Sequence, residues 1–231
     1  MTMPEAQKRD PPWLILHRSG EDAKRLRAGL ASAADFVEID VWSEDGRASC
    51  RHDPLLIAGW PYLTRRYGLP WPRLRRLWLD EVEAAGRVFL DFKDPRPAVV
   101  DEAVGGLRRS GSLAGAIGST PMWSHLDHLA ELAPTVGRFY SIGRGTAGSA
   151  AWERYRERMG TEAAGWGVSI HQASADAGRL AALRGAGLRA ICYVVNDEAR
   201  GVELVEQGAG GLTSDRLDLI SRWRDRWGSR E

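Results

Sequence analysis

The sequence predicts a single α/β domain over residues 1–231, folded as a (β/α)8 or TIM barrel. Apolar runs rich in β-branched residues alternate along the chain with segments of helical periodicity, as expected of repeated βα units around a parallel sheet. Eight such runs can be counted, which is the number of strands in this barrel. A closed α/β barrel also commonly occupies a chain of this length as one domain.

The predicted strands are short apolar runs that end in polar residues. They lie at residues 13–17, 36–41, 87–92, 114–119, 137–142, 165–170, 189–195 and 210–213. An accessory strand near 47–52 is expected to pair with the second one. The turn between them contains Asp45-Gly46, a strong signal for a tight hairpin.

Apolar residues at spacings of three and four predict helices between these strands. The helices are expected at 21–33, 97–109, 124–133, 150–159, 174–186, 197–207 and 215–227. Ser174 and Ser214 are predicted N-caps, and Gly187 and Gly208 stand where a left-handed helix end favours glycine. Residues 54–72 are rich in proline and aromatic residues and predict a short cap or rim loop inserted after the second strand, while 1–11 are expected to be flexible.

Composition narrows the possible partners and the compartment. The chain carries 32 basic and 31 acidic residues, a formal net charge of +1, which argues against nucleic acid or an anionic membrane as the main partner. No run approaches the roughly 18 apolar residues of a membrane span, and no apolar signal region opens the chain, so we expect a cytoplasmic protein with no integral membrane segment. Cys50 and Cys192 lack the spacing of a metal site or a disulfide framework and are predicted core residues.

Three carboxylates at predicted strand ends indicate a metal site. Glu38 and Asp40 are two residues apart in one strand, so their side chains share a face. Two acids on one inner face need a compensating charge, which a hard cation such as Mg²⁺ or Ca²⁺ supplies, and Asp91 on the next barrel strand is the natural third ligand. Solvated acids on an exposed face are the structural alternative.

The same parity places Lys93 beside Asp91. A buried ion pair is one interpretation of this spacing, and a free ammonium that contacts a phosphate oxygen is the other. Three carboxylates and one divalent cation sum to −1, and Arg18 with Lys93 brings the formal total to +1. That total suits a phosphodiester, which carries one negative charge.

Two histidines at predicted strand ends, His17 and His52, can supply the acid and base that cleavage of a phosphodiester needs. Tyr193 and Asn196 end the seventh barrel strand and are predicted to contact the substrate from the rim. A core position is the structural alternative for Tyr193. His125 and His128 lie three apart on a predicted helix with no partner ligands nearby, so we expect solvated side chains rather than zinc ligands.

These motifs resemble the glycerophosphodiester phosphodiesterase family, within the barrel phosphodiesterases related to phosphatidylinositol-specific phospholipase C. The resemblance spans nearly the whole chain. Its motifs are His17-Arg18, Val37-Glu38-Ile39-Asp40-Val41 with Asp45-Gly46 and His52-Asp53-Pro54, Leu90-Asp91-Phe92-Lys93, and more weakly Tyr193-Val194-Val195-Asn196 and the segment from Gly208 to Asp215.

The resemblance implies a (β/α)8 barrel of lipid metabolism that hydrolyses a glycerophosphodiester to glycerol 3-phosphate and an alcohol. It implies Glu38, Asp40 and Asp91 as ligands of one divalent cation, and His17 and His52 as acid and base. Arg18 and Lys93 would hold the phosphate. The chain departs from most members in having Ser19-Gly20 after the His-Arg pair, aspartate rather than glutamate as the third acid, and a shorter insertion after His52.

Two other functions remain open at this stage. The Asp-x-Lys strand and the short insertion are also similar to the sphingomyelinase D-like phospholipases, which act on choline-bearing lysolipids and can form a cyclic phosphate. That hypothesis predicts an apolar trough near Trp60, Tyr62 and Trp71. The other is a barrel that binds a phosphorylated ligand without turnover. The leaving-group alcohol, the choice between Mg²⁺ and Ca²⁺, the order of the two histidines and the oligomeric state are left open by the sequence.

Overall fold

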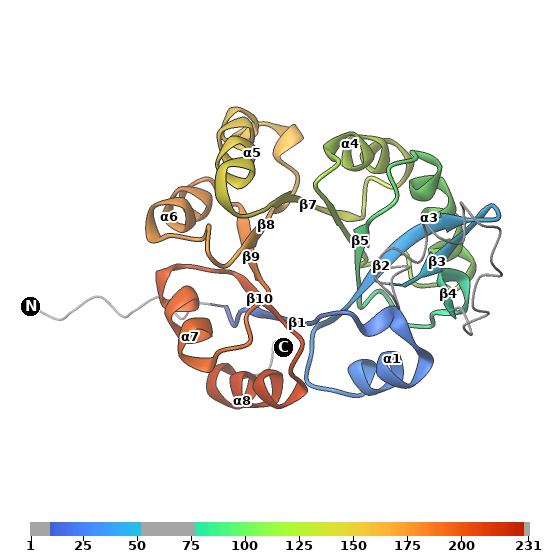
Figure 1. Cartoon of the computed structure of the whole chain (residues 1–231), viewed down its shortest axis with the longest axis horizontal. Coiled ribbons are helices and arrows are strands. Elements are labelled where there is room, and N and C mark those ends of the chain that lie inside the picture. Colours follow the sequence, from blue (N-terminus) through green and yellow to red (C-terminus); the bar gives the residue numbers. More distant parts are fainter. Residues whose placement is uncertain (1–9, 52–76, 229–231) are drawn as a thin grey trace, which may run out of the picture.

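Eight parallel strands close into a barrel, as the sequence predicts (Figure 1). The computed structural model describes residues 10–51 and 77–228. The barrel strands are β1 (Trp13–Leu16), β2 (Phe36–Glu44), β5 (Val88–Phe92), β6 (Ile117–Thr120), β7 (Gly137–Ile142), β8 (Gly167–His171), β9 (Arg189–Tyr193) and β10 (Gly211–Ser214). The barrel is closed because β1 pairs in parallel with both β2 and β10.

Helices surround the strands in the order that the chain visits them (Figure 1). They are α1 (Ala23–Leu30), α3 (Ala98–Arg109), α4 (Trp123–Leu132), α5 (Gly145–Arg158), α6 (Ala177–Gly185), α7 (Glu198–Gln207) and α8 (Leu217–Trp227). The predicted helix at 150–159 in fact begins earlier, at Gly145. No helix in the described ranges has the length and hydropathy that a membrane crossing requires.

Neither of the two predicted serines is the N-cap residue of its helix. The Asp176 side chain accepts a hydrogen bond from the amide of Arg179 and caps α6, while Ser174 Oγ donates to the Gly143 carbonyl instead. A carboxylate there also meets the positive end of the helix dipole. The N-cap of α8 is Arg216, so the expectation for Ser214 was wrong as well. Gly208 does end α7 in the left-handed conformation, as predicted.

Strand alternation separates two apolar regions. Outward residues such as Leu14, Val37 and Leu90 pack under the helices in the main core. Inward residues form a compact plug across the middle of the barrel, made of Ile15, Phe89, Ile117, Phe139 and Ile191, each no more than 4% exposed. Burying one such side chain stabilises the fold by about 1.5–3 kcal/mol. This packed plug therefore forms a rigid floor below the carboxyl ends of the strands.

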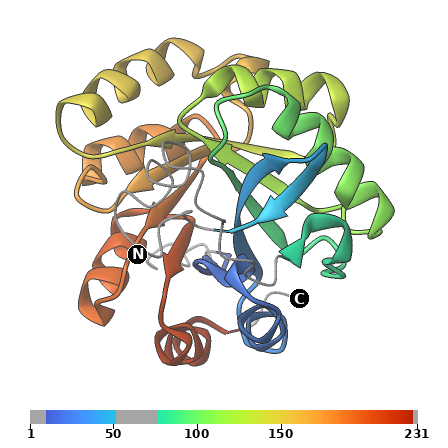
Figure 2. The same cartoon turned by 45° about the vertical axis from the view of Figure 1, so that its right-hand side comes forward.

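A hairpin extends the barrel at β2. Strand β3 (Arg47–Cys50) pairs antiparallel with β2 and then with the short β4 (Leu77–Trp78), and it contacts α3 beside the barrel (Figure 2). Asp45 and Gly46 both adopt positive φ angles in the turn, as the predicted tight hairpin requires. The predicted cap at 54–72 lies outside the described residues.

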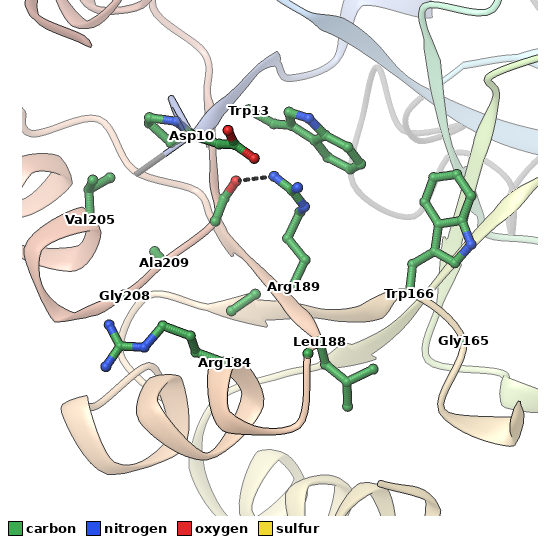
Figure 3. Close-up of a pocket in the computed structure, with 14 residues that line it drawn as sticks. Asp10, Trp13, Gly165, Trp166, Arg184, Leu188, Arg189, Val205, Gly208 and Ala209 are labelled. Atoms are coloured by element: carbon green, nitrogen blue, oxygen red, sulfur yellow. Dashed lines mark hydrogen bonds between the residues drawn. The ribbon is translucent and has the colours of Figure 1, made fainter. Parts of the chain in front are cut away.

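A second cavity lies at the amino-terminal ends of the strands, away from the expected catalytic end. It has a volume of about 720 Å³ and lies beside Trp13, Trp166 and Arg189 (Figure 3). The Arg189 guanidinium lies 3.9 Å from the centre of the Trp13 ring and donates to the Gly210 carbonyl. Its charge therefore interacts with groups of the protein itself. In this barrel architecture chemistry occupies the carboxyl ends of the strands and the opposite end serves stability.

Candidate active site

The three predicted metal ligands meet at the carboxyl ends of β2 and β5. Parallel pairing places Asp40 directly beside Asp91, and Glu38 lies one inward step below Asp40 on the same strand. One carboxylate oxygen from each of the three residues lies within 4.8 Å of the other two. Glu38 and Asp40 are buried, and the Asp91 side chain is 22% exposed. This is the inward face that the two-residue spacing predicted.

The electrostatic environment of Glu38, Asp40 and Asp91 favours the binding of a cation. Burial, together with the charges of Asp40 and Asp91, raises the pKa of Glu38 well above its usual range. Burial likewise raises the pKa of Asp91 to about 6, although Lys93 acts against that shift. Among the described residues, no well-directed hydrogen bond reaches either oxygen of Asp40 or Oδ1 of Asp91. Clustered carboxylate oxygens are the ligands that Mg²⁺ or Ca²⁺ prefers, and here they outnumber the donors around them, so the residues fit a divalent cation.

Lys93 extends from the end of β5 to both aspartates. Its Nζ lies 2.9 Å from Asp40 Oδ1 and also bonds Asp91 Oδ2. Burial acts against the charged lysine, but the two carboxylates more than offset it and raise the pKa of Lys93. The side chain is 30% exposed, so this ammonium also faces the cavity above the carboxylates.

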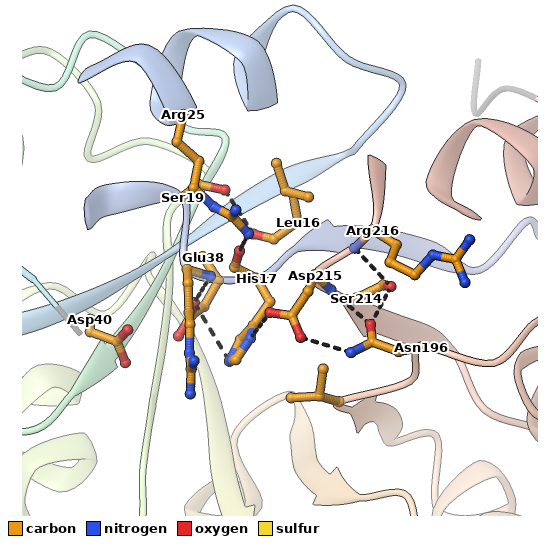
Figure 4. A network of polar contacts seen from close by, with 12 residues as sticks. Leu16, His17, Ser19, Arg25, Glu38, Asp40, Asn196, Ser214, Asp215 and Arg216 are labelled. Atoms are coloured by element: carbon orange, nitrogen blue, oxygen red, sulfur yellow. Dashed lines mark hydrogen bonds and ion pairs between the residues drawn. The ribbon is translucent and has the colours of Figure 1, made fainter. Parts of the chain in front are cut away.

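His17 follows β1 and is held by an aspartate that the sequence analysis missed. His17 Nδ1 lies 2.7 Å from Asp215 Oδ1 (Figure 4). The bond to His17 holds the pKa of Asp215 well below its usual range, so the carboxylate is ionised and Nδ1 must be the donor. His17 Nε2 is directed to the carboxylate side and lies 4.0 Å from Glu38 Oε2.

Asn196 supports this aspartate rather than lining the cavity. Its Nδ2 donates to Asp215 Oδ2 over 2.7 Å, and its Oδ1 accepts from Ser214 Oγ and from the amide of Asp215 (Figure 4). The end of β9 is thereby tied to the end of β10 around His17. The predicted substrate contact of Asn196 stays a prediction, and in this structure the amide group positions Asp215.

Arg18 acts on Glu38 through its backbone. It adopts a left-handed conformation, with φ of 53°, and its amide donates to Glu38 Oε2 over 2.6 Å. Arg25 fixes the same turn from α1 by donating to the His17 carbonyl. The Arg18 side chain is half-buried, and its predicted phosphate contact is not tested by this arrangement.

His17, Glu38, Asp91 and Lys93 line one cavity of about 290 Å³ above the apolar plug. Phe89 forms part of its floor, and Tyr193 lines its wall with a hydroxyl that donates to the Ile142 carbonyl. The remaining lining residues are mostly small, and they include four inward hydroxyl side chains that the sequence analysis did not single out, Ser119, Ser141, Ser169 and Thr213.

Two histidine predictions have other outcomes. His52, the predicted second acid or base, lies outside the described residues, and its role stays a prediction. His125 was expected to be solvated, but it is 3% exposed, and its Nε2 lies 3.0 Å from the Asp94 carbonyl. The inward face of α4 accounts for its burial. His128, on the outer face, contacts Asp101 as an exposed residue would.

Solved structures with the same architecture are numerous. A protein of Silicibacter pomeroyi assigned as a glycerophosphoryl diester phosphodiesterase superposes with a TM-score of 0.75 at 17% identity, over 96% of either chain. An Oleispira antarctica phosphodiesterase, solved with its product sn-glycerol-3-phosphate, gives 0.71 at 21% identity, over 93% of this chain and 97% of that one. A glycerophosphodiester phosphodiesterase of Parabacteroides distasonis gives 0.70 at 15% identity, over 95% of this chain and 100% of that one.

The chain has the fold of the glycerophosphodiester phosphodiesterases. This likeness confirms the predicted (β/α)8 barrel, and it confirms the resemblance drawn from the motifs at the level of the fold. No protein-family model matches the chain, and no curated protein matches it by sequence. The likeness to these solved structures therefore lies in the arrangement of strands and helices, at 15–21% sequence identity.

Proposed function

We propose that the chain is a phosphoric diester hydrolase that depends on a divalent cation and cleaves a glycerophosphodiester to glycerol 3-phosphate and an alcohol. One observation carries the proposal. A single cavity at the carboxyl ends of the strands is lined by Glu38, Asp91, Lys93 and His17. Asp40 completes the carboxylate trio beside it, and Asp215 holds His17 from behind. The fold shared with glycerophosphodiester phosphodiesterases supports the same reaction class.

Each group has a distinct part in this reaction. A cation, Mg²⁺ or Ca²⁺, held by Glu38, Asp40 and Asp91 would supply positive charge to the non-bridging oxygens of the diester. Lys93 adds a second positive charge on the cavity side of the same carboxylates and contacts a phosphate oxygen.

His17 is the proton-transfer group of the described residues. Asp215 accepts from Nδ1, which leaves Nε2 on the cavity side as the atom that takes a proton or gives one up. The second proton transfer of the cleavage is assigned to His52 from the motif alone. Tyr193 lies in the cavity wall, where its ring limits the width available to the substrate.

Phosphorus NMR of the purified protein with glycerophosphocholine tests the proposal. We expect a glycerol 3-phosphate signal that requires Mg²⁺ or Ca²⁺ and disappears with a chelator. His17→Ala should slow turnover on the order of 10²–10⁴-fold, the usual contribution of a positioned acid or base. His128→Ala is the matched control, since His128 lies on the outer face of α4. Turnover that survives His17→Ala in folded protein would contradict the proposal.

Lysophosphatidylcholine belongs in the same experiment. A cyclic phosphate formed from this lysolipid, with no product from glycerophosphocholine, would assign the chain to the sphingomyelinase D-like reaction instead. Tight binding of glycerol 3-phosphate without turnover of either diester would identify a binding barrel. The three outcomes give different phosphorus signals and so exclude one another.

A further inference from the structure

The cavity at the amino-terminal ends of the strands is separate from the proposed catalytic cavity. We call it the amino-terminal cavity, and Trp13, Trp166, Arg184 and Arg189 are among the residues that line it (Figure 3). No residue lines both cavities, and the apolar plug lies between them, with Trp13 packed against it. The volume of about 720 Å³ is typical of small-molecule sites, which span about 300–1,000 Å³. This cavity is therefore large enough for a ligand of its own.

Trp166 presents an aromatic surface to the amino-terminal cavity. The residue is 44% exposed, and Leu217 is the only other large apolar residue of the described ranges with comparable exposure. The indole ring is nevertheless held on one side, since it lies against the backbone of Gly137, where a Cβ atom would come 2.5 Å from Trp166 Cε3. Trp13 lies next to it, with the ring centres 6.4 Å apart. A large aromatic ring that is supported on one side and open to solvent offers a surface on which a planar ring can stack.

Arg184, in the last turn of α6, brings a positive charge to the same cavity. Its side chain is exposed, and no hydrogen bond or ion pair joins its guanidinium to another described residue. It lies beside Gly208, where a Cβ atom would come 3.2 Å from Arg184 Nη1. Arg189 adds a second positive charge, and Asp10 is the one acid in the lining, so the formal charge of the lining is +1. An arginine can bind a carboxylate or a phosphate through two parallel hydrogen bonds, so the cavity is complementary to an anion.

We propose that the amino-terminal cavity binds a small planar aromatic anion, with the ring on Trp166 and the anionic group on Arg184. The charge of the lining opposes a cationic ligand, and an uncharged apolar ligand would gain nothing from Arg184. The site is separated from the carboxylate trio by the apolar plug, so the inference does not depend on the proposed function. It gives the end of the barrel opposite the chemistry a binding role and no catalytic one.

Fluorine NMR of the full chain labelled with fluorotryptophan tests the site directly. The Trp166 resonance is assigned by its loss in Trp166→Phe. In the presence of EDTA, which keeps cations from the catalytic cavity, we expect indole-3-acetate to shift this resonance saturably. Tryptophol has the ring without the charge, and cyclohexaneacetate has the charge without the aromatic ring. Each should bind at least about tenfold more weakly than indole-3-acetate.

Arg184→Met removes the charge and keeps a side chain of similar width. It should weaken the binding of indole-3-acetate about tenfold, to the affinity of tryptophol, and leave tryptophol itself unchanged. Arg156→Met is the matched control, because Arg156 is also exposed in the last turn of a helix, α5, but pairs with Glu153 and lies outside the cavity. It should change neither affinity.

Three results would overturn the inference: a Trp166 resonance that does not shift or shifts without saturation, equal affinity for the three compounds, or no effect of Arg184→Met. Displacement of indole-3-acetate by glycerol 3-phosphate with Mg²⁺ would also reject it, by placing the ligand in the catalytic cavity. Self-association in sedimentation that Trp166→Phe abolishes would identify a second copy of the chain as the occupant instead. Hydrolysis of a diester without binding of indole-3-acetate would reject this inference alone, and the reverse result would reject the proposed function alone.

Discussion

His17 Nδ1 and Asp215 Oδ1 lie 2.7 Å apart, although the two residues are separated by 198 positions in the sequence. Closure of the barrel through the β1–β10 pairing brings them together, since Leu16 and Ser214 are register partners immediately before them. An ionised Asp215 fixes the proton on Nδ1 and the ring orientation of His17, which leaves Nε2 available on the side of Glu38.

Asp215→Asn removes this orientation without changing the size of the side chain. The introduced amide can present a donor to Nδ1 and so favour the wrong tautomer of His17. We expect kcat to fall on the order of 10²–10⁴-fold, as for other aspartates that orient a catalytic histidine. KM should change little, because Asp215 does not line the cavity. Steady-state kinetics on glycerophosphocholine measures kcat and KM separately and so checks both expectations.

Asp218→Asn provides the control for that variant. Asp218 lies three residues on and pairs with Arg216 and Arg222 at the surface, so its loss should leave kcat within about twofold, as for most exposed ion pairs. An equal loss of activity in both variants, or none in Asp215→Asn, would show that Asp215 does not position His17.

Asp91→Asn is expected to separate the stability of the metal-free protein from its response to cations. Burial raises the pKa of Asp91 to about 6. At pH 7.5 the carboxylate is still ionised, but its charge is less favourable in the folded protein than in the unfolded chain, and a neutral amide removes that cost. The melting temperature of the metal-free protein should rise by about 2–6 °C. The further stabilisation by Mg²⁺ should largely disappear, because one ligand is lost.

Asp80→Asn should behave in the opposite way and is the matched control. Hydrogen bonding to Arg47 lowers the pKa of Asp80, so its charge is favourable in the folded state. Its neutral variant should melt at a lower temperature and keep the response to Mg²⁺. Differential scanning calorimetry with and without the cation measures both quantities, and an intact cation response in Asp91→Asn would remove Asp91 from the ligand set.

The same carboxylates predict how the cation effect depends on pH. Their folded pKa values are raised, so below pH 6 the folded state holds protons that the unfolded state has released. The contribution of Asp91 to the stability of the metal-free protein therefore falls as pH rises through about 4 to 6, and that of Glu38 also falls with rising pH. A cation must displace those protons, so saturating Mg²⁺ should raise the melting temperature more at pH 7.5 than at pH 5.0. Equal increments at the two pH values would count against the site.

Strand parity explains why the sequence predicted so much of the site. Residues two apart in a strand share a face, and the pairing of β2 with β5 then sets Asp40 against Asp91, so Glu38, Asp40, Asp91 and Lys93 had to converge once the barrel was accepted. His17 follows from the same rule on β1. The local sequence needed no knowledge of distant contacts to place these groups on one inner surface.

Asp215 was missed because its role depends on closure of the barrel. Ser214-Asp215 before a helix is also a good capping sequence, and that local interpretation was preferred. The available signal was parity: Asp215 continues the inward series of Gly211 and Thr213 past the end of β10. The four hydroxyl residues that line the cavity, Ser119, Ser141, Ser169 and Thr213, were missed for a related reason, since single serines in short strands carry no local signal until their shared cavity is seen.

Lys93→Met tests whether the lysine serves structure or substrate. The substitution keeps the length of the side chain but removes the charge that balances Asp40 and Asp91, and leaving buried carboxylates without a counter-charge is destabilising by about 2–4 kcal/mol. Mg²⁺ should restore most of that stability, since it supplies positive charge to the same oxygens. If Lys93 also contacts the phosphate, the cation-loaded variant should still lose binding of glycerol 3-phosphate by calorimetry. A variant that regains both stability and ligand affinity with Mg²⁺ would restrict Lys93 to a structural ion pair.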